Sequence, residues 1–221
     1  MVSMVKIYFI SNEFPLPNVD FLNYLNSFPL DIKSKILRFS RWQDAQASLL
    51  GKVLLKKGLD DFNLDSNLSK LKYTNYGRPY IEGALDFNIA HSGNYVVCAF
   101  STIGRIGVDI EEVKEVSVGE FKNQFLEEEW NAIINSENIH HSFYAYWTAK
   151  EAIIKADGKG LSIPLKNILL KDGKSLLGKK TWHYRAVALA DNYIMHIASD
   201  YQLLNINSIG LEWKDIVNVK S

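Results

Sequence analysis

The stretch Gly107-Val108-Asp109-Ile110-Glu111 alternates apolar and acidic side chains, which is the period-two pattern of a β-strand. Val108 and Ile110 should face one side of the strand, and Asp109 and Glu111 the other. Two residues along a strand span roughly 6.6 Å, so both carboxylates can reach a single cation. Like charges at this distance repel unless a cation or solvent separates them. Taken alone, the motif fits the solvated face of an edge strand better than a metal site.

Short helices and strands are expected on both sides of this stretch. Before it, the sequence pattern predicts a strand at 6–10, helices at 31–39 and 42–57, and strands at 87–90 and 95–100. The central strand covers 105–113, and it is followed by a mostly helical segment at 118–135, a helix at 141–157 and an antiparallel sheet at 168–200. Gly58 and Gly158 are expected to end the helices that precede them. Gly104 to Gly107 resembles a hinge between an N-terminal half, 1–104, and a C-terminal half, 105–221.

A second polar motif lies on the helix predicted at 141–157. In Trp147-Thr148-Ala149-Lys150-Glu151-Ala152-Ile153-Ile154-Lys155, the side chains of Glu151 and Lys155 are four residues apart and share one face. Alone, they fit an ordinary surface ion pair worth a few tenths of a kcal/mol. Combined with Asp109 and Glu111, they form a set of three carboxylates and a lysine that suits a hard cation and a phosphate. Mg²⁺ prefers such oxygen ligands, and no Cys/His spacing resembles a zinc site.

Composition narrows the classes of partner. The 221 residues are 47 % hydrophobic and can bury a core in one large domain or two small ones. Lys plus Arg and Asp plus Glu each number 25, so net charge gives no reason to expect nucleic acid or an anionic membrane. The one cysteine, Cys98, has apolar neighbours and indicates a buried structural thiol. Without a secretory signal or a run of about eighteen apolar residues, the chain is expected to be soluble and cytoplasmic.

The motifs together resemble a known family. Gly107 to Glu111, Trp147-x-x-Lys150-Glu151-Ala152-x-x-Lys155 and Gly158-x-Gly160-Leu161 are similar to the motifs of the 4′-phosphopantetheinyl transferase superfamily. Tyr76-Gly77-Arg78-Pro79 and Phe87-Asn88-Ile89-Ala90-His91-Ser92 resemble two further motifs of its long, surfactin-type branch. The matching blocks run in the family's order from about Lys35 to Pro164. The resemblance implies an α+β fold, a pseudo-dimer of two similar α+β halves with coenzyme A in the cleft between them. A faint internal echo between 48–59 and 147–161 is in line with two related halves.

The resemblance also implies roles for the charged residues. The magnesium-binding acids correspond to Asp109, Glu111 and Glu151. Lys150 and Lys155 match two lysines that bind coenzyme A, and Lys155 is the candidate that stabilises and protonates the departing phosphate. Glu129 falls at the position of the proposed general base, and Glu128 is its rival within an acidic run.

Coenzyme A contacts are implied in the first half as well. His91 matches a histidine near the 3′-phosphate of coenzyme A, and Lys35 and Ser48 match positions that touch the same phosphate. Ile32 stands where some relatives have a second basic residue, and Lys33 is the neighbouring candidate to replace it. The remaining implied contacts come from two short motifs, Tyr76, Gly77, Arg78 and Pro79 in the first and Ala90 and Ser92 in the second.

The implied function is transfer of the phosphopantetheine arm of coenzyme A to a serine of an apo acyl or peptidyl carrier protein, with Mg²⁺ and release of adenosine 3′,5′-bisphosphate. The carrier should dock on the segment after Glu112, where Lys114 and Lys122 could steer an acidic partner. The chain is expected to act as a monomer, and the pathway (fatty acid, polyketide or nonribosomal peptide) stays open. Two alternatives are a metal-dependent phosphohydrolase acting on coenzyme A or a related diphosphate and a non-catalytic carrier-binding module.

Overall fold

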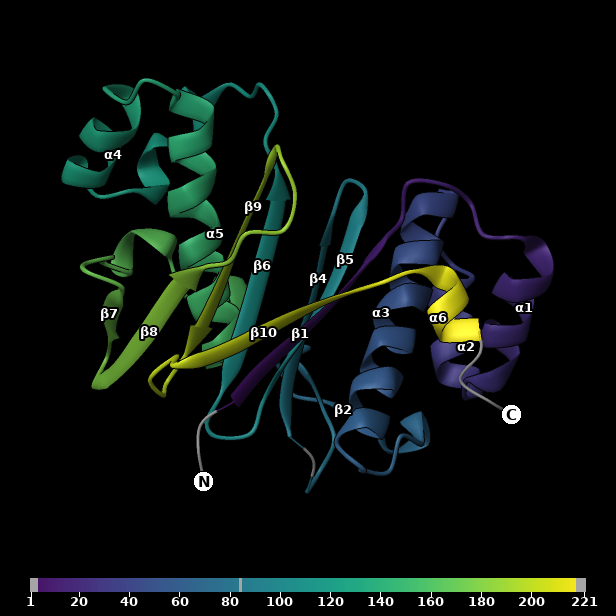
Figure 1. The fold of residues 1–221 in the computed structure, drawn as a ribbon. Coiled ribbons are helices and arrows are strands. Elements are labelled where there is room, and N and C mark those ends of the chain that lie inside the picture. Colours follow the sequence, from purple (N-terminus) through teal and green to yellow (C-terminus); the bar gives the residue numbers. More distant parts are fainter. Residues whose placement is uncertain (1–3, 84, 218–221) are drawn as a thin grey trace.

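The computed structural model describes residues 4–83 and 85–217, with Leu161 and Val217 described by their backbone alone. The ends of the two expected halves, residues 1–3 and 218–221, and position 84 lie outside the described residues. The fold is α+β, and its helices and sheets form four layers (Figure 1). Two four-stranded sheets face each other in the middle, and helices cover their outer sides.

The first sheet has the strand order β10-β1-β5-β4. Helix α3 packs on its outer side, next to α1 and α2, and forms a core with residues such as Leu50, Leu54 and Phe100. The elements of this half are β1 (Met4–Ser11), α1 (Asn18–Ser27), α2 (Leu30–Ile36), α3 (Trp42–Asp61), the 3₁₀ helix η1 (Leu68–Lys70), β2 (Lys72–Tyr73), β3 (Pro79–Tyr80), β4 (Asp86–Ser92) and β5 (Tyr95–Ser101).

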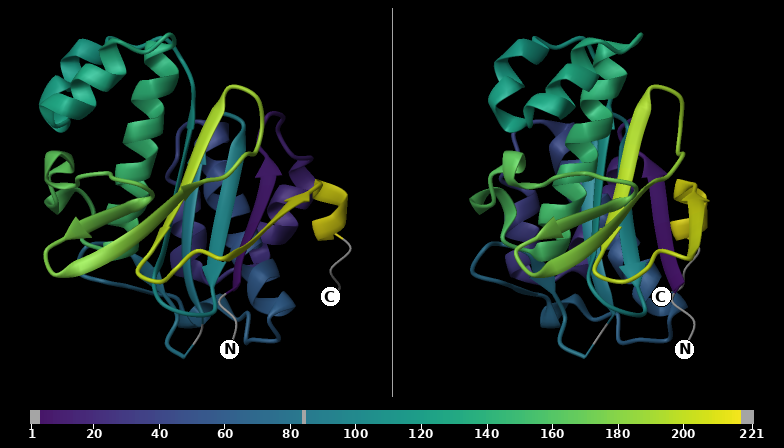
Figure 2. Two further views of the ribbon diagram at one scale, coloured as in Figure 1. Left: turned by 60° about the vertical axis from the view of Figure 1, so that its left-hand side comes forward. Right: turned by 90° about the vertical axis from the view of Figure 1, so that its left-hand side faces the viewer.

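The second sheet has the strand order β6-β9-β8-β7 and is covered by α5. Figure 2 shows this sheet between α5 and the first sheet. The elements of this half are β6 (Ile106–Glu112), the 3₁₀ helix η2 (Val118–Gln124), α4 (Glu127–Ile134), α5 (Ile139–Asp157), the 3₁₀ helices η3 (Gly160–Ser162) and η4 (Leu165–Asn167), β7 (Lys174–Leu177), β8 (Lys180–Ala186) and β9 (Tyr193–Ser199).

The alternation in β6 has the predicted consequence. Val108 and Ile110 are fully buried between the two sheets, where they join Val97 and Ile197 in one apolar cluster. Asp109 points to the other side, toward α5. The strand is therefore not a solvated edge, because both of its faces are covered. This confirms the α+β fold, and the two halves face each other as a pseudo-dimer requires.

Gly58 does not end α3 as predicted, since the helix continues to Asp61. A Cβ atom on Gly58 would lie 2.2 Å from the ring of Phe100, so the glycine allows the helix to approach the sheet closely. Gly158 behaves as predicted: with a φ of 88° it takes the left-handed conformation that caps α5.

The chain returns to the first half after β9. Strand β10 (Asn205–Leu211) pairs in parallel with β1 from Met4↔Asn205 to Ile10↔Leu211, and α6 (Trp213–Val217) follows it. Tyr24 donates a hydrogen bond to the carbonyl of Ile216, and Ile216 is buried in the core of the first half. Residues 205–217 therefore belong spatially to the first half. Across residues 4–83 and 85–217, no helix is both long and apolar enough to cross a bilayer.

Candidate active site

The two halves meet along β4 and β6, which are twenty residues apart in the chain and lie side by side. Side chains of β4 accept hydrogen bonds from backbone amides of β6: Asn88 from Val108 at 2.9 Å and Ser92 from Glu112 at 3.1 Å. The Ser92 hydroxyl also donates to Oε2 of Glu111 at 2.7 Å. This seam places the predicted His91-Ser92 motif of the first half directly beside the predicted acids of the second half.

Asp109 and Lys155 form the centre of the site. Gly107 lets α5 lie against β6, because a Cβ there would be 2.1 Å from the carbonyl oxygen of Ala152. The close approach brings Nζ of Lys155 to 2.5 Å from Oδ1 of Asp109, which is only 4 % exposed. Oδ2 of Asp109 is buried and has no hydrogen-bond partner within the described residues. Buried carboxylate oxygens normally contact a hydrogen-bond donor or a cation, so this oxygen can still accept such a partner.

The three predicted acids influence one another electrostatically. Burial, and then the charge of Asp109, raise the pKa of Glu151 to about 7, and Glu111 acts in the same direction. Burial also raises the pKa of Glu111, with a smaller contribution from Asp109. Burial alone would lower the pKa of Lys155, but Asp109, Glu151 and Glu111 outweigh it, so the pKa lies above its usual value. The ammonium is thus held charged by three carboxylates.

These residues fit Mg²⁺ by their chemistry. They offer carboxylate oxygens, one of which is buried without a partner, and their mutual repulsion would be relieved by a cation. As the side chains stand, however, no group of three acidic, histidine or cysteine residues in the described parts of the chain converges closely enough to hold an ion. Instead, the ammonium of Lys155 forms an ion pair with Asp109 and balances its charge.

Glu129 and Lys150 lie elsewhere in the second half. Nζ of Lys150 is 2.6 Å from Oε2 of Glu129 and 3.1 Å from the carbonyl oxygen of Leu165. Oε2 of Glu129 also accepts the backbone amide of Leu126, while its Oε1 is buried without a partner among the described residues. Lys150 was predicted to contact coenzyme A, but its side chain is fully buried. Within the described chain, no hydrogen bond or ion pair joins this pair to the three acids.

His91 stands between two groups of positive charge. Loss of solvent around the ring, followed by the nearby charge of Lys155 and a smaller one from Lys52, lowers its pKa, and Asp44 acts in the opposite direction. Lys52 also lines a cavity of about 410 Å³ together with the predicted residues Lys35 and Ser48. The positive charges of Lys155 and of Lys52 in this cavity thus both act on the neutral ring of His91.

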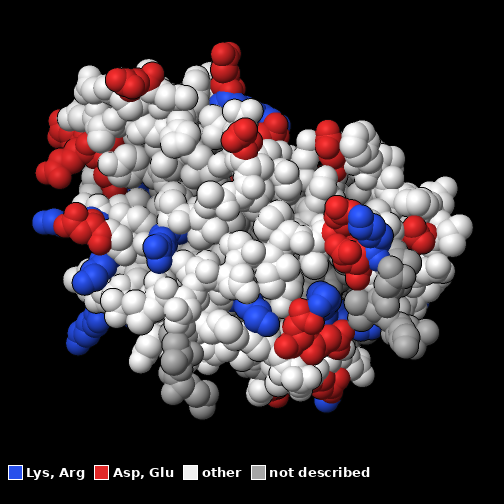
Figure 3. Space-filling model, viewed as in Figure 1, with Lys and Arg blue, Asp and Glu red and all other residues white. Residues whose placement is uncertain are grey.

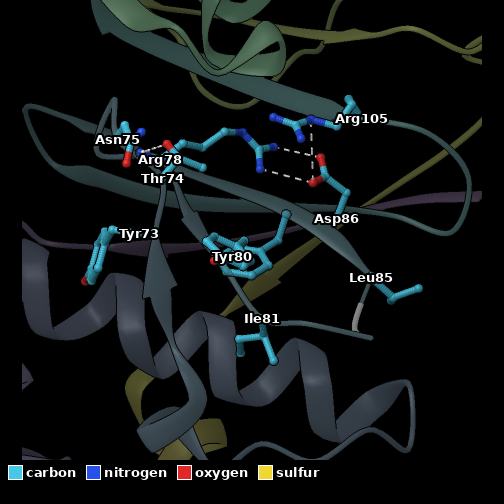
Figure 4. A pocket seen from close by; sticks show the side chains of 10 residues that line it. Tyr73, Thr74, Asn75, Arg78, Tyr80, Ile81, Leu85, Asp86 and Arg105 are labelled. Carbon is cyan, nitrogen blue, oxygen red and sulfur yellow. Dashed lines mark hydrogen bonds and ion pairs between the residues drawn. The ribbon is translucent and has the colours of Figure 1, made fainter.

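Arg78 makes contacts inside the protein. Figure 4 shows its guanidinium and that of Arg105 turned toward Asp86, at one end of a cavity of about 540 Å³. Arg78 binds Asp86 through two nitrogens at 3.0 and 2.7 Å and donates to the carbonyl oxygens of Lys155 and Ile106. Its side chain joins the halves and also lines this cavity. In the same motif, Tyr76 is exposed, Gly77 has a φ of 80° that suits its turn, and Pro79 begins β3.

Two family models match the chain in succession. The model of the N-terminal domain of 4′-phosphopantetheinyl transferases matches residues 16–103, and that of the 4′-phosphopantetheinyl transferase superfamily matches residues 105–203. 4′-Phosphopantetheinyl transferase Sfp of Bacillus subtilis (strain 168) is 33 % identical over 172 residues, 76 % of each chain. The chain belongs to the 4′-phosphopantetheinyl transferase superfamily. Its similarity to Sfp and to gsp places it in the surfactin-type branch.

Two other relatives of this transferase illustrate the range of the family. The gsp protein of Aneurinibacillus migulanus is 34 % identical over 149 residues, covering 66 % of this chain and 62 % of the relative. The L-aminoadipate-semialdehyde dehydrogenase-phosphopantetheinyl transferase of Xenopus laevis is 29 % identical over 199 residues, covering 75 % and 66 %.

Sequence reasoning missed two features of the transferase. Lys52 was not singled out, although a lysine inside the apolar run Leu49-Leu50-Gly51-Lys52-Val53-Leu54-Leu55 could have drawn attention. His196 lies opposite Asp109 in the β6–β9 ladder, and its Nδ1 is 2.8 Å from the hydroxyl of Thr148. No local sequence pattern predicts that contact, because it depends on the pairing of strands that are far apart in the chain.

Proposed function

We propose that this transferase moves the 4′-phosphopantetheine group of coenzyme A to a serine hydroxyl of an apo carrier protein and releases adenosine 3′,5′-bisphosphate. The observation that carries the proposal is the ion pair of Lys155 with Asp109 near Glu111 and Glu151, together with His91, on which the charges of Lys155 and Lys52 both act. Such an arrangement suits a ligand with a diphosphate at one end and a separate phosphate some distance away. Coenzyme A is a ligand of that kind.

Lys155 is the residue of this chain best placed to act on the diphosphate. Its ammonium keeps its proton because three carboxylates surround it, so it can hold a phosphate oxygen and protonate the leaving group. Asp109, Glu111 and Glu151 would hold Mg²⁺, which neutralises charge on the diphosphate when it is bound. The unpartnered oxygen of Asp109 supports this assignment. The remaining catalysis is positioning and electrostatic stabilisation, as in other phosphoryl transfers.

Glu129 is proposed as the base that accepts the serine proton. The support is that Lys150 and the amide of Leu126 engage only Oε2, which leaves Oε1 without a partner in the described structure. Oε1 therefore has a lone pair free to accept the proton of a serine hydroxyl. A carrier serine would have to reach this oxygen directly or through one water.

The carrier is proposed to dock on the segment that follows β6. Lys114 and Lys122 are exposed there and could attract an acidic helical partner. Val118 is buried against Phe125 and Phe143, so it supports the segment from within. The side chains of Val113, Val116 and Phe121 are partly exposed to solvent, so a carrier could contact them.

We further propose that the chain acts in the cytoplasm as a monomer, without nucleic acid or a membrane as partner. The zero net charge supports this, as does the face in Figure 3, where basic and acidic side chains are interspersed except for an acidic corner at α4. A single chain supplies both sides of the β4–β6 seam. The relatives described above have transferase names, and nothing in the comparisons favours a phosphohydrolase or a non-catalytic module.

Intact-mass spectrometry of apo carrier proteins tests the proposal. Each carrier is incubated with the transferase, coenzyme A and Mg²⁺, and the mass of one carrier should rise by that of a phosphopantetheine group. Glu151→Gln keeps the shape of the side chain and removes its charge, so it should abolish the rise, whereas transfer at the wild-type rate would contradict the role of the acids. Coenzyme A consumed equally without a carrier would favour the phosphohydrolase.

A further inference from the structure

Lys52 is a partly buried lysine without a counter-charge. It lies on the inner side of α3, among residues that pack against the first sheet, and it lines the 410 Å³ cavity near Ser48, one helical turn earlier. In the described parts of the chain, no carboxylate, carbonyl or ring pairs with its ammonium. A lysine held in this way is costly, because its charge has lost solvent and has gained no partner.

The groups that face Lys52 are cationic or neutral. Lys35 reaches the cavity from α2, where its ammonium lies 4.0 Å from the centre of the Tyr73 ring. His91 approaches from β4. Burial lowers the pKa of Lys52; Cys98 acts in the opposite direction, and Lys35 adds a smaller lowering contribution. Lys35, Arg38 and Lys52 line the cavity with no acid among its lining residues, and three cationic groups are suited to binding an anion with more than one negative charge.

The rest of the cavity matches such an anion. The hydroxyl of Ser48 supplies a hydrogen-bonding group on the same helix face as Lys52. Ile32, where a basic residue would be expected, is 2 % exposed and forms an apolar wall. Lys33 does not replace it, because its ammonium lies 3.4 Å from the Asn26 side chain on the exposed side of α2. It does not line the cavity.

We propose that Lys52, together with Lys35 and Ser48, binds the phosphate monoester of the donor substrate and makes the contact that Ile32 cannot make. This inference rests on the proposed function, in which that group is the 3′-phosphate of coenzyme A. The missing positive charge on α2 is supplied from α3, four residues after Ser48. The charges of Lys52 and of Lys155 both act on His91.

Transfer kinetics with coenzyme A and with dephospho-coenzyme A, which lacks the 3′-phosphate, test the inference. Lys52→Met should raise KM for coenzyme A by about 10- to 100-fold, the effect of losing a charge-assisted hydrogen bond, and change KM for dephospho-coenzyme A by less than about 2-fold. Lys52→Arg should keep most of the preference. Lys56→Met, one turn further along α3 and exposed, is the matched control and should behave like the wild type. Misfolding would affect both substrates equally.

Other outcomes would overturn the inference. These are a wild-type enzyme that does not distinguish the two substrates, a Lys52→Met variant with the wild-type ratio, or a Lys33→Met variant that loses the preference instead. If the wild type transfers nothing, the proposed function fails, and calorimetric titration decides about the site separately. Adenosine 3′,5′-bisphosphate should then bind more tightly than adenosine 5′-monophosphate to the wild type, and Lys52→Met should remove the difference. Equal binding of both nucleotides by the wild type would overturn the site.

Discussion

Glu129 and Lys150 carry opposite charges into the interior, where they are 4 % and 0 % exposed. Removing one partner of such a pair leaves the other charge buried and uncompensated, which typically costs about 3–5 kcal/mol. Replacing both by apolar side chains of similar size is often close to neutral. Loss of activity in a Glu129 variant is therefore ambiguous unless stability is measured with it.

Glu129→Leu should lower the free energy of unfolding by about 3–5 kcal/mol, because it leaves the ammonium of Lys150 unpaired. The double variant Glu129→Leu with Lys150→Met should recover most of that loss. Urea denaturation measures both. If Glu129 is the base, the stable double variant will still fail to transfer phosphopantetheine. A double variant with normal transfer would exclude Glu129 as the base.

His196 should make stability depend on pH. Burial lowers its pKa to about 4, and the neutral ring donates from Nδ1 to the Thr148 hydroxyl, whose own proton goes to the carbonyl of Tyr144. Between pH 6.5 and pH 4 the unfolded chain binds a proton at this histidine and the folded chain does not, so stability falls as the pH falls through this window. The loss should reach about 3 kcal/mol by pH 4.

Urea denaturation at several pH values measures this effect as a difference between the wild type and His196→Asn. Carboxyl groups contribute to both proteins and largely cancel. The difference in the free energy of unfolding should change steadily from pH 7 to pH 4 and then level off. A constant difference across that range would show that His196 becomes protonated in the folded protein as easily as in the unfolded one.

Single residues differ in how far the sequence alone predicted them. The sequence predicted that Val108 and Ile110 face one side of the strand and Asp109 the other, because this depends only on the two-residue period of one strand. The contact between Asp109 and Lys155 required a resemblance, since it joins a strand to a helix 46 residues later. The position of Lys52 in the phosphate cavity was not predictable, because a helix pattern does not show which cavity a half-buried lysine lines.

Helix α5 and strand β6 form the contact on which the geometry of the site depends. At Gly107 the helix backbone comes so close that even a methyl group would lie 2.1 Å from the Ala152 carbonyl and 2.5 Å from the Ala156 amide. Neither atom can move without moving the helix, and α5 carries both Glu151 and Lys155. Space at this one glycine therefore sets the distance between the helix and the acids of the strand.

Gly107→Ala should destabilise the protein by about 1–3 kcal/mol or more, as overpacking does, and should reduce transfer further by displacing Lys155 from Asp109. Gly119→Ala is the matched control for stability, because a Cβ there meets nothing within 4 Å. Urea denaturation and the carrier mass assay measure the two effects. A Gly107→Ala variant as stable as Gly119→Ala and as active as the wild type would contradict the close packing.

The elements were predicted better than their ends. The helix at 42–57 was expected to end at Gly58, a rule based on the conformation that glycine often takes at helix ends. In the structure, contact with Phe100 decides the role of this glycine, and the helix runs through it. A local rule cannot anticipate packing against a strand that lies more than forty residues further along the chain.

The two halves are joined by Arg78, whose guanidinium reaches Asp86 in the first half and two carbonyl oxygens in the second. Arg78→Lys keeps the charge but cannot reproduce the two-nitrogen contact with Asp86 or all of the carbonyl bonds. It should lower the free energy of unfolding by about 1–3 kcal/mol. Arg41→Lys, at an exposed ion pair of 4.0 Å, should change it by less than about 0.5 kcal/mol.

Thermal or urea unfolding followed by tryptophan fluorescence and by circular dichroism measures this change. If Arg78 joins the halves, the two signals should also separate in the Arg78→Lys variant, because the halves lose part of their cooperativity. Equal stability of the two lysine variants would show that the Asp86 contact does little.

The overall arrangement in two halves was implied by the resemblance. The return of the chain to the first half was not predicted, because no sequence pattern in 205–211 indicates that this strand pairs with β1.

The pairing of β10 with β1 has a consequence for how the protein is made. A ribosome releases the chain from the N-terminus, so β1, β5 and β4 emerge while 205–217 is still unsynthesised. Until the last segment arrives, β1 is an open edge with unpaired backbone groups, which is the kind of edge that recruits foreign strands. The first half therefore completes its sheet only after 205–211 has been synthesised, and expressing 1–104 alone should yield an aggregation-prone fragment rather than a small folded domain.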